Sequence, residues 1–149
     1  MITIKEMAEM LGISTTTVSN VINGKTSEVS QKTAEKVQKL LDEYDYVPNM
    51  NAKNLAQNHS RLIGIVLKRK KDKYDNIFTD PFHGELLGSL ETAIRERGYY
   101  MMLYTSEDID EIVRNVVSWN TEGLILIGML HDDYLKIRSK YKKPAVLID

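Results

Sequence analysis

The sequence predicts an all-α three-helix headpiece, meaning a small N-terminal helical domain, followed by an α/β domain with a doubly wound parallel sheet. Over residues 1–44, apolar residues recur at helical spacing and glycines interrupt them. Beyond residue 61, short apolar runs alternate with helical patterns, which is typical of a parallel sheet covered by helices. We therefore expect a headpiece over residues 1–47, a hinge helix and linker over 48–61, and an incomplete α/β domain over 62–149.

The first headpiece helix is expected over residues 4–11. Thr3 and Glu6 match a capping box, in which the threonine caps the helix and the glutamate bonds back to the N-cap backbone. Its apolar side chains fall at i, i+3, i+4 and i+7, namely Ile4, Met7, Ala8 and Leu11. Gly12 ends this helix, and Ser14 can cap a second helix shortly afterwards. Two short helices joined by a glycine turn indicate a helix-turn-helix.

The second helix has two unlike faces. One is an apolar stripe that needs a core, formed by Val18, Val21 and Ile22. The other carries short, neutral hydrogen-bonding groups, from Thr15, Thr16, Ser19 and Asn20. Gly24 suits the chain reversal that ends the helix. The polar face is suited to entering a DNA major groove, and the alternative is an ordinary solvated surface helix.

A third helix completes the headpiece. Ser30 can cap it, and it is expected over about residues 31–44. Its inner stripe is expected at Ala34, Val37, Leu41 and Tyr44. The first and third helices would hold the second one outward.

The linker contains a short helical segment. Pro48 disfavours a helix at the preceding residue, and Asn49 can cap a new helix over residues 50–57. Isolated helices shorter than about 12–15 residues are marginal in water, so this one needs support. Leu55 would be exposed on it beside Lys53. The segment is either a flexible linker or a hinge helix that docks in the minor groove with its leucine between base steps.

The remaining residues predict a βαβαβαβ series. Continuous apolar runs indicate strands buried on both faces, at 62–67, 100–104, 123–127 and 145–148. Helical patterns lie between them, at 82–97, 110–119 and 132–140. Gly98 would stop the first of these helices.

Composition and charge restrict the class of protein. The 149 residues are 42% hydrophobic, lack cysteine, and contain no apolar run near the roughly 20 residues of a membrane span. Without a signal pattern, the cytoplasm is the expected location. Residues 1–61 hold seven Lys or Arg and seven Asp or Glu, so the strongly basic domain that would support DNA binding is missing. Phosphate contacts would come largely from hydroxyls, backbone N–H groups and helix N-termini.

No enzymatic constellation is found. No glycine-rich phosphate-binding motif follows Leu67. The three histidines, His59, His83 and His131, are too widely spaced for a triad or a metal site and are expected at the surface. The pair Asp132-Asp133 is expected to begin a helix. We therefore predict no catalytic residue, no metal and no cofactor.

Residues 3–57 resemble the DNA-binding headpiece of the LacI family of bacterial transcription regulators. Residues 62–149 resemble the first half of that family's effector-binding domain, which is similar to periplasmic sugar-binding proteins. The residues that support the resemblance are Thr3-Ile4-Lys5, Ala8, Gly12-Ile13-Ser14, Thr17-Val18-Ser19, Val21-Ile22-Asn23-Gly24, Tyr46-Val47-Pro48-Asn49, Ala52, Leu55, Asp80-Pro81-Phe82, Gly98-Tyr99 and Glu122-Gly123-Leu124-Ile125-Leu126.

The resemblance implies a repressor that binds a palindromic DNA operator as a homodimer, under control of a sugar or nucleoside-like effector. It assigns base reading to Thr15, Thr16 and Asn20, where relatives often have Arg or His at the last position. It assigns phosphate contacts to Thr3, Ser14, Thr17, Ser19 and Asn23. It places Lys53 and Leu55 in the minor groove, and Asp80 and Phe82 beside the effector.

The sequence also departs from the family. Relatives usually exceed 300 residues, whereas only four predicted strands of the first effector lobe are present here. His83 replaces a common phenylalanine, and the basic loop over residues 68–73 is longer than usual, which indicates a solvated loop or, alternatively, a site for an anion. Two other functions remain open: a DNA-binding form without effector response, and a headpiece that binds a protein partner.

Overall fold

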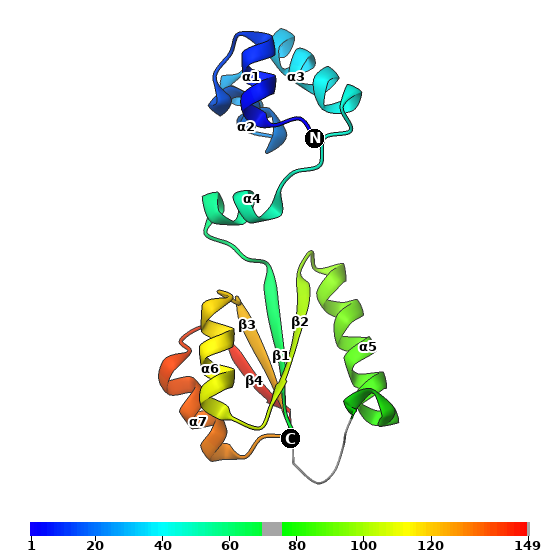
Figure 1. The fold of residues 1–149 in the computed structure, drawn as a ribbon, viewed down its shortest axis with the longest axis vertical. Helices are drawn as coiled ribbons and strands as arrows, with labels where there is room; N and C mark the ends of the chain where they lie inside the picture. Colours follow the sequence, from blue (N-terminus) through cyan, green and yellow to red (C-terminus); the bar gives the residue numbers. More distant parts are fainter. Residues whose placement is uncertain (70–75, 149) are drawn as a thin grey trace. The chain divides into compact units, whose positions relative to one another are not determined.

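A computed structural model describes residues 1–69 and 76–148. The chain divides into two compact units, Met1–Lys53 and the residues from Asn54 onward. The first unit is helical, and the second contains a parallel sheet with helices between its strands (Figure 1). The predicted fold class, an all-α headpiece followed by an α/β sheet, is confirmed.

The helical unit contains α1 (Ile4–Leu11), α2 (Thr15–Ile22), the 3-10 turn η1 (Thr26–Glu28) and α3 (Gln31–Glu43). Its helices begin where the caps were expected. Thr3 and Glu6 form the capping box of α1, and the hydroxyl of Ser30 accepts a hydrogen bond from the Thr33 N–H at 3.2 Å. Gly12 ends α1 in the left-handed conformation, with φ of 63°, which glycine adopts without steric cost.

The headpiece core is made by one face of each helix. Its buried side chains are Met7, Ala8, Val18, Val37 and Leu40. The expectation that Tyr44 lies on the inner stripe was wrong, because 48% of it is exposed. Helix α3 ends at Glu43 and the chain reverses at Asp45, with φ of 45°, so Tyr44 leaves the stripe and Leu40 occupies the core instead.

Helix α4 (Met50–Gln57) forms in the linker, as predicted from its cap. The side-chain oxygen of Asn49 accepts hydrogen bonds from the N–H groups of Asn51 at 3.0 Å and Ala52 at 3.3 Å. None of the residues of α4 is buried. Its stability therefore depends on what holds its ends rather than on a core.

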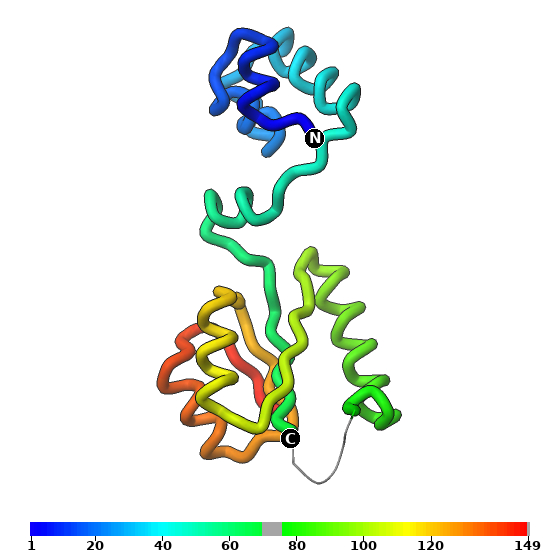
Figure 2. The backbone as a smooth tube through the Cα atoms, in the orientation of Figure 1, coloured from blue at the N-terminus to red at the C-terminus, as the bar shows by residue number. Residues whose placement is uncertain are grey.

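The α/β unit has four parallel strands, β1 (Leu62–Lys68), β2 (Tyr100–Ser106), β3 (Gly123–Ile127) and β4 (Ala145–Ile148), in the order β2-β1-β3-β4. Between them lie η2 (Ile77–Thr79), α5 (Pro81–Glu96), α6 (Ile109–Ser118) and α7 (His131–Lys140). The tube in Figure 2 shows α5 on one face of the sheet and α6 and α7 on the other. The sheet is therefore doubly wound, and its order reverses between β1 and β3.

Two apolar clusters cover the faces of this sheet. Val66, Leu124 and Leu126 pack with α6 and α7 on one face, and Ile65, Leu67 and Ile127 pack with α5 on the other. Gly64 on β1 leaves room for the Leu124 side chain of β3, because a Cβ at this position would come within 2.6 Å of that side chain. Within the described residues, no helix is long and apolar enough to cross a membrane.

Candidate nucleic-acid interface

The beginning of α2 is closed by its own hydroxyl groups. The Ser14 Oγ accepts a hydrogen bond from the Thr17 N–H at 3.1 Å and lies 2.8 Å from the Thr17 hydroxyl. The turn from Gly12 to Ser14 is therefore held by a local cap, which needs no contact outside the helix-turn-helix. One of the two hydroxyl protons lies between these oxygens and the other can still donate, so a phosphate contact from Ser14 or Thr17 stays chemically open.

The outer face of α2 presents the three residues expected to read bases. Thr15 and Thr16 are exposed and Asn20 is half-buried, whereas Val18 on the opposite side is completely buried. Within the described residues, the structure gives the side chains of Thr15, Thr16 and Asn20 no hydrogen-bond partner. Their amide and hydroxyl groups are thus available to base edges, because they lie on the face of α2 that does not pack against the core.

The end of α2 is capped by Asn23. Its amide Nδ2 donates to the Ser19 carbonyl at 2.9 Å and lies 3.3 Å from the Ser19 hydroxyl. The two residues expected to contact phosphates at this end therefore support one another. Gly24 follows with φ of 71°, the left-handed conformation predicted for the chain reversal.

Thr3 is placed less favourably for its expected phosphate contact. Its N–H and its hydroxyl both donate to the Glu6 carboxylate, at 2.7 and 2.8 Å. These hydrogen bonds lower the pKa of Glu6, so the carboxylate beside Thr3 is ionised at neutral pH. A negative charge at this position repels a phosphate, and the role of Thr3 stays a prediction.

Helix α4 exposes the side chain that was expected to enter the minor groove. Leu55 is 85% exposed, while Lys53 is half-buried. Because Leu55 is exposed on a helix without buried residues, its side chain contributes little hydrophobic stabilisation to the fold. Its exposure is consistent with a wedge that finds its apolar contact between base steps.

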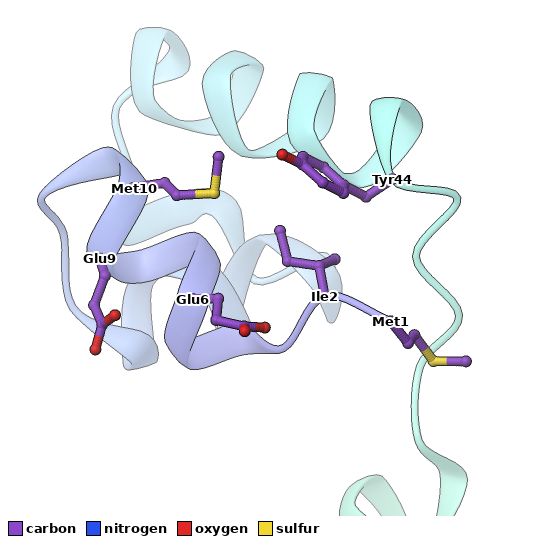
Figure 3. A pocket seen from close by; sticks show the side chains of 6 residues that line it. All are labelled: Met1, Ile2, Glu6, Glu9, Met10 and Tyr44. Carbon is purple, nitrogen blue, oxygen red and sulfur yellow. The ribbon is translucent and has the colours of Figure 1, made fainter.

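A hollow of about 510 Å³ lies on the headpiece between the N-terminus, α1 and α3 (Figure 3). Side chains of both apolar and acidic type line it: Met1, Ile2, Glu6, Glu9, Met10 and Tyr44. Because its charged members are both carboxylates, the hollow does not suit a phosphate backbone. The outer face of α2 stays the predicted DNA-contacting surface of the headpiece.

The two residues expected beside the effector lie at the beginning of α5. The Asp80 carboxylate caps this helix by accepting from the Phe82 N–H at 2.9 Å, and the Phe82 side chain is 64% exposed. The expectation that His83 lies at the surface was wrong. Only 18% of its side chain is exposed, and its Nδ1 lies 3.3 Å from the carboxylate of Asp80, the N-cap of α5. The two side chains meet because residues three apart lie on the same face in the first turn of a helix.

A cleft of about 390 Å³ lies near the carboxyl end of β2. It is lined by Arg69, Asn76, Ile77, Phe78, Leu103, Tyr104 and Thr105. In a doubly wound sheet, ligands bind at the carboxyl ends of the strands, so this cleft is a candidate wall of an effector site. The expected neighbour Phe82 does not line it, and Phe78 does.

Beside this cleft, Glu111 on α6 joins the end of β2. Its carboxylate accepts hydrogen bonds from the Tyr104 hydroxyl at 2.7 Å and the Ser106 hydroxyl at 2.5 Å. These bonds lower the pKa of Glu111, and the one from Tyr104 raises the pKa of that phenol. Asn115 adds a bond to the Tyr104 hydroxyl at 2.8 Å. This network was not predicted from the sequence, because only the packing of α6 against β2 brings its members together.

The basic loop expected over residues 68–73 lies partly outside the described residues, which omit 70–75. Lys68 is described and belongs to β1 rather than to a solvated loop. Its Nζ lies 2.7 Å from the Asp133 carboxylate, which also accepts from the Leu130 N–H at 3.3 Å. Asp132 and Asp133 lie in the first turn of α7, so the prediction that this pair begins a helix is confirmed.

Residues 3–49 match the family model described as bacterial regulatory proteins, lacI family. In the part of the chain that is described, no group of three or more His, Asp or Glu side chains could hold a metal ion.

Similarity to individual proteins extends beyond the headpiece. The chain is 37% identical over 155 residues to the HTH-type transcriptional repressor PurR of Vibrio campbellii, covering 100% of this chain and 44% of that protein. It is 30% identical over 153 residues to the HTH-type transcriptional regulator PtxS of Pseudomonas aeruginosa, covering 99% of this chain and 42% of that protein. The Sucrose operon repressor of Klebsiella pneumoniae is 30% identical to the chain, and the match covers 99% of this chain and 44% of that protein. The chain thus spans less than half the length of these relatives, all of which are named as regulators or repressors.

Solved structures show the same arrangement of elements. The lac repressor dimer bound to operator and the anti-inducer ONPF matches with a TM-score of 0.82 at 26% identity, over 99% of this chain and 44% of that one. The lac repressor bound to ONPG in the repressed state matches with a TM-score of 0.79 at 26% identity, over the same shares.

Proposed function

Because the chain belongs to the lacI family of bacterial regulatory proteins, we propose that it is a sequence-specific DNA-binding transcription regulator that acts as a repressor. It binds a palindromic operator as a homodimer, so that two headpieces occupy two half-sites. Since its target is the bacterial chromosome, it works in the cytoplasm.

The observation that carries this proposal is the outer face of α2. Its polar side chains, Thr15, Thr16 and Asn20, have no task within the described part of the headpiece, whereas the opposite face supplies the buried Val18. An asparagine amide can pair with adenine through two hydrogen bonds, and a threonine methyl group can contact the methyl group of thymine. Thr15, Thr16 and Asn20 therefore read bases in the major groove.

Phosphate contacts fix the register of the headpiece on the duplex. We assign them to hydroxyl and amide groups at the two ends of α2, from Ser14, Thr17, Ser19 and Asn23. Lys53 and Leu55 on α4 enter the minor groove at the centre of the operator. With no net charge over residues 1–61, affinity depends on the fit of these contacts more than on long-range attraction.

An effector modulates this binding through the carboxyl edge of the sheet. The lac repressor structures that the chain matches hold ONPF or ONPG, and one relative is named for a sucrose operon. We therefore assign a sugar or nucleoside-like effector, with Asp80 and Phe82 beside it and the cleft at Phe78 and Tyr104 as a further wall. The second candidate is a DNA-binding form that does not respond to an effector.

The experiment is selection of binding sites from random DNA duplexes by the 149-residue chain, repeated with candidate sugars and nucleosides. We expect a palindromic sequence to be enriched and its affinity to fall steeply with salt concentration. No enrichment would contradict the proposal, and binding that does not depend on salt to a protein partner would favour an interaction headpiece. An effector that changes the enriched affinity separates the two regulator forms.

A further inference from the structure

The chain between α4 and β1 is bonded to the turn between α6 and β3. Residues 58–61 leave α4, and residues 120–122 precede β3, so about 60 residues separate the two segments in sequence. Both belong to the unit that begins at Asn54. We call these two segments and the bonds between them the linker clasp.

Glu122 is the centre of the linker clasp. Its Oε1 accepts a hydrogen bond from the Arg61 backbone N–H at 3.0 Å and lies 3.0 Å from the Nδ1 of His59. The carboxylate is mostly buried, with 19% of its side chain exposed, whereas His59 is 64% exposed. The hydrogen bond from the Arg61 N–H and, to a smaller extent, the one with His59 hold the pKa of Glu122 below its ordinary value. Burial of the carboxylate acts in the opposite direction and does not cancel this effect. Glu122 is thus an ionised acceptor at neutral pH, and such acceptors form stronger hydrogen bonds than neutral ones.

A second set of bonds runs through Ser60. Its hydroxyl donates to the Asn120 carbonyl at 2.6 Å and accepts from the Leu62 N–H at 3.2 Å. Lys143 holds the other side of the turn, because its Nζ donates to the Asn120 side chain at 2.6 Å and to the Thr121 carbonyl at 2.9 Å. The turn at Asn120 is therefore hydrogen-bonded both to the chain before β1 and to the chain before β4.

The clasp reaches the last turn of α4 through Asn54. Its side-chain amide donates to the Ser60 carbonyl at 3.1 Å, and its own carbonyl accepts from the His59 N–H at 3.1 Å. None of residues 54–57 is buried in an apolar core that could orient them. The bonds of the clasp are thus what connects the end of α4, including the exposed Leu55, to the sheet.

The backbone of the clasp is unusual. Asn58, Arg61 and Asn120 all have positive φ, of 51°, 56° and 52°. Asparagine tolerates this conformation, but arginine does so rarely, and it persists only where the surroundings impose it. At Arg61 they do so on both sides, since its N–H donates to Glu122 and its carbonyl accepts from the Tyr100 N–H at 2.8 Å.

We propose that Glu122 is a positioning residue for operator binding: it touches no DNA, but it orients the hinge helix from the sheet side through Arg61 and His59. The proposal rests on the proposed function and names a residue that controls it. Loss of the Glu122 carboxylate frees the Arg61 N–H and lets residues 58–61 take other conformations. Leu55 then enters the minor groove less often, although the base-reading face of α2 is unchanged.

The test compares Glu122→Ala, Glu122→Gln and the control Glu107→Ala in the full chain, on the enriched duplex. Glu107 is exposed to solvent, unlike Glu122, and follows the carboxyl end of β2, at the edge of the sheet opposite to Glu122. We expect Glu122→Ala to bind about tenfold more weakly, because a charged acceptor of two bonds is lost. Glu122→Gln keeps an acceptor for Arg61 and is expected to recover part of this loss, whereas Glu107→Ala is expected to bind as the parent does.

Two further readouts separate positioning from a general folding defect. At saturating protein, the bend of the bound duplex should be smaller for Glu122→Ala, while the order of preference among operator variants stays the same. A folding defect would lower the active fraction and leave the bend of the bound complex unaltered. Parental affinity and parental bend in Glu122→Ala would overturn the proposal.

Amide hydrogen exchange of the DNA-free chain tests the clasp independently of the proposed function. The Arg61 N–H should exchange faster in Glu122→Ala than in Glu107→Ala, and unchanged exchange would overturn the proposal. If Glu122→Ala does not fold, Ser60→Ala replaces it, with the same expected changes in exchange and bend. Failure of the parent chain to select any duplex would refute the proposed function, whereas the exchange result would still report on the clasp.

Discussion

The Tyr104 hydroxyl donates a 2.7 Å hydrogen bond to the Glu111 carboxylate, and this bond joins the end of β2 to the first turns of α6. The Ser106 hydroxyl donates a hydrogen bond to the other oxygen of this carboxylate. The three side chains therefore form a hydrogen-bonded network around one carboxylate at the carboxyl end of β2.

The first prediction concerns the response of the α/β unit to acid. The pKa of Glu111 in the folded state lies below its ordinary value of 4.5, chiefly because of the bonds from Ser106 and Tyr104. The ionised carboxylate therefore stabilises the folded state above pH 4.5, and this stabilisation is lost as the pH falls through the folded pKa. We expect the unfolding temperature of Glu111→Gln to fall less steeply with acid than that of the parent.

The fluorescence of Trp119, the only tryptophan, measures this transition because it follows α6 directly. Some acid dependence should remain in Glu111→Gln, since the pKa of Glu122 is lowered as well. Glu107→Gln serves as the control and should keep the slope of the parent. Equal slopes in all three proteins would contradict the prediction.

The second prediction concerns base reading by Asn20. Replacing it with alanine removes the amide that can pair with adenine, so discrimination at one operator position should fall by about 1–3 kcal/mol. Binding to a panel of single-base operator variants measures the change. Gln38→Ala, at an exposed position of α3, is the matched control. A uniform loss across all variants would assign Asn20 a contact with phosphate or a structural role instead.

The third prediction concerns the cap of α2. Ser14→Ala removes the acceptor of the Thr17 N–H and should destabilise the headpiece by about 1 kcal/mol. Helical circular dichroism during thermal unfolding measures this loss, and Trp119 reports whether the α/β unit is unaffected. Ser27→Ala lies in η1, which has no side-chain cap, and should leave stability unchanged. A Ser14→Ala headpiece as stable as the Ser27→Ala headpiece would show that the cap contributes little.

The fourth prediction concerns Leu55. Its side chain is 85% exposed, so Leu55→Ala should leave the unfolding temperature of both units unaltered. On the enriched duplex the same variant should lower both affinity and bending, because the wedge between base steps is lost. Leu135→Ala, which changes a leucine that is 51% exposed on α7, is the control. A bend equal to that of the parent, measured by gel mobility, would exclude insertion of Leu55.

Much of the fold follows from local patterns. The caps at Thr3, Ser14, Ser30 and Asn49, and the reversals at Gly12, Gly24 and Gly98, lie where the sequence predicted them. The strands also begin at the predicted residues, because a buried parallel strand is a continuous apolar run with polar residues at its ends. Capping and burial involve residues that are close in sequence, and a single sequence displays them directly.

The two residues whose exposure was predicted wrongly, Tyr44 and His83, lie where a helix ends or begins. Tyr44 continues the apolar spacing of α3, but the helix ends one residue earlier and the side chain stays 48% exposed. His83 is partly covered because it lies in the first turn of α5, 3.3 Å from the cap Asp80. Spacing predicts the face of a helix, and it does not predict how far the helix continues.

The face that would read DNA was predicted from the sequence alone: the spacing of Val18, Val21 and Ile22 leaves Thr15, Thr16 and Asn20 on the outer side of α2. The linker clasp and the Glu111 network could be found only in the tertiary structure. Glu122 and Arg61, like Tyr104 and Glu111, meet because parallel strands align their ends and the helices pack across them. Such contacts depend on strand order and on packing between distant segments, for which the order of residues along the chain contains no local pattern.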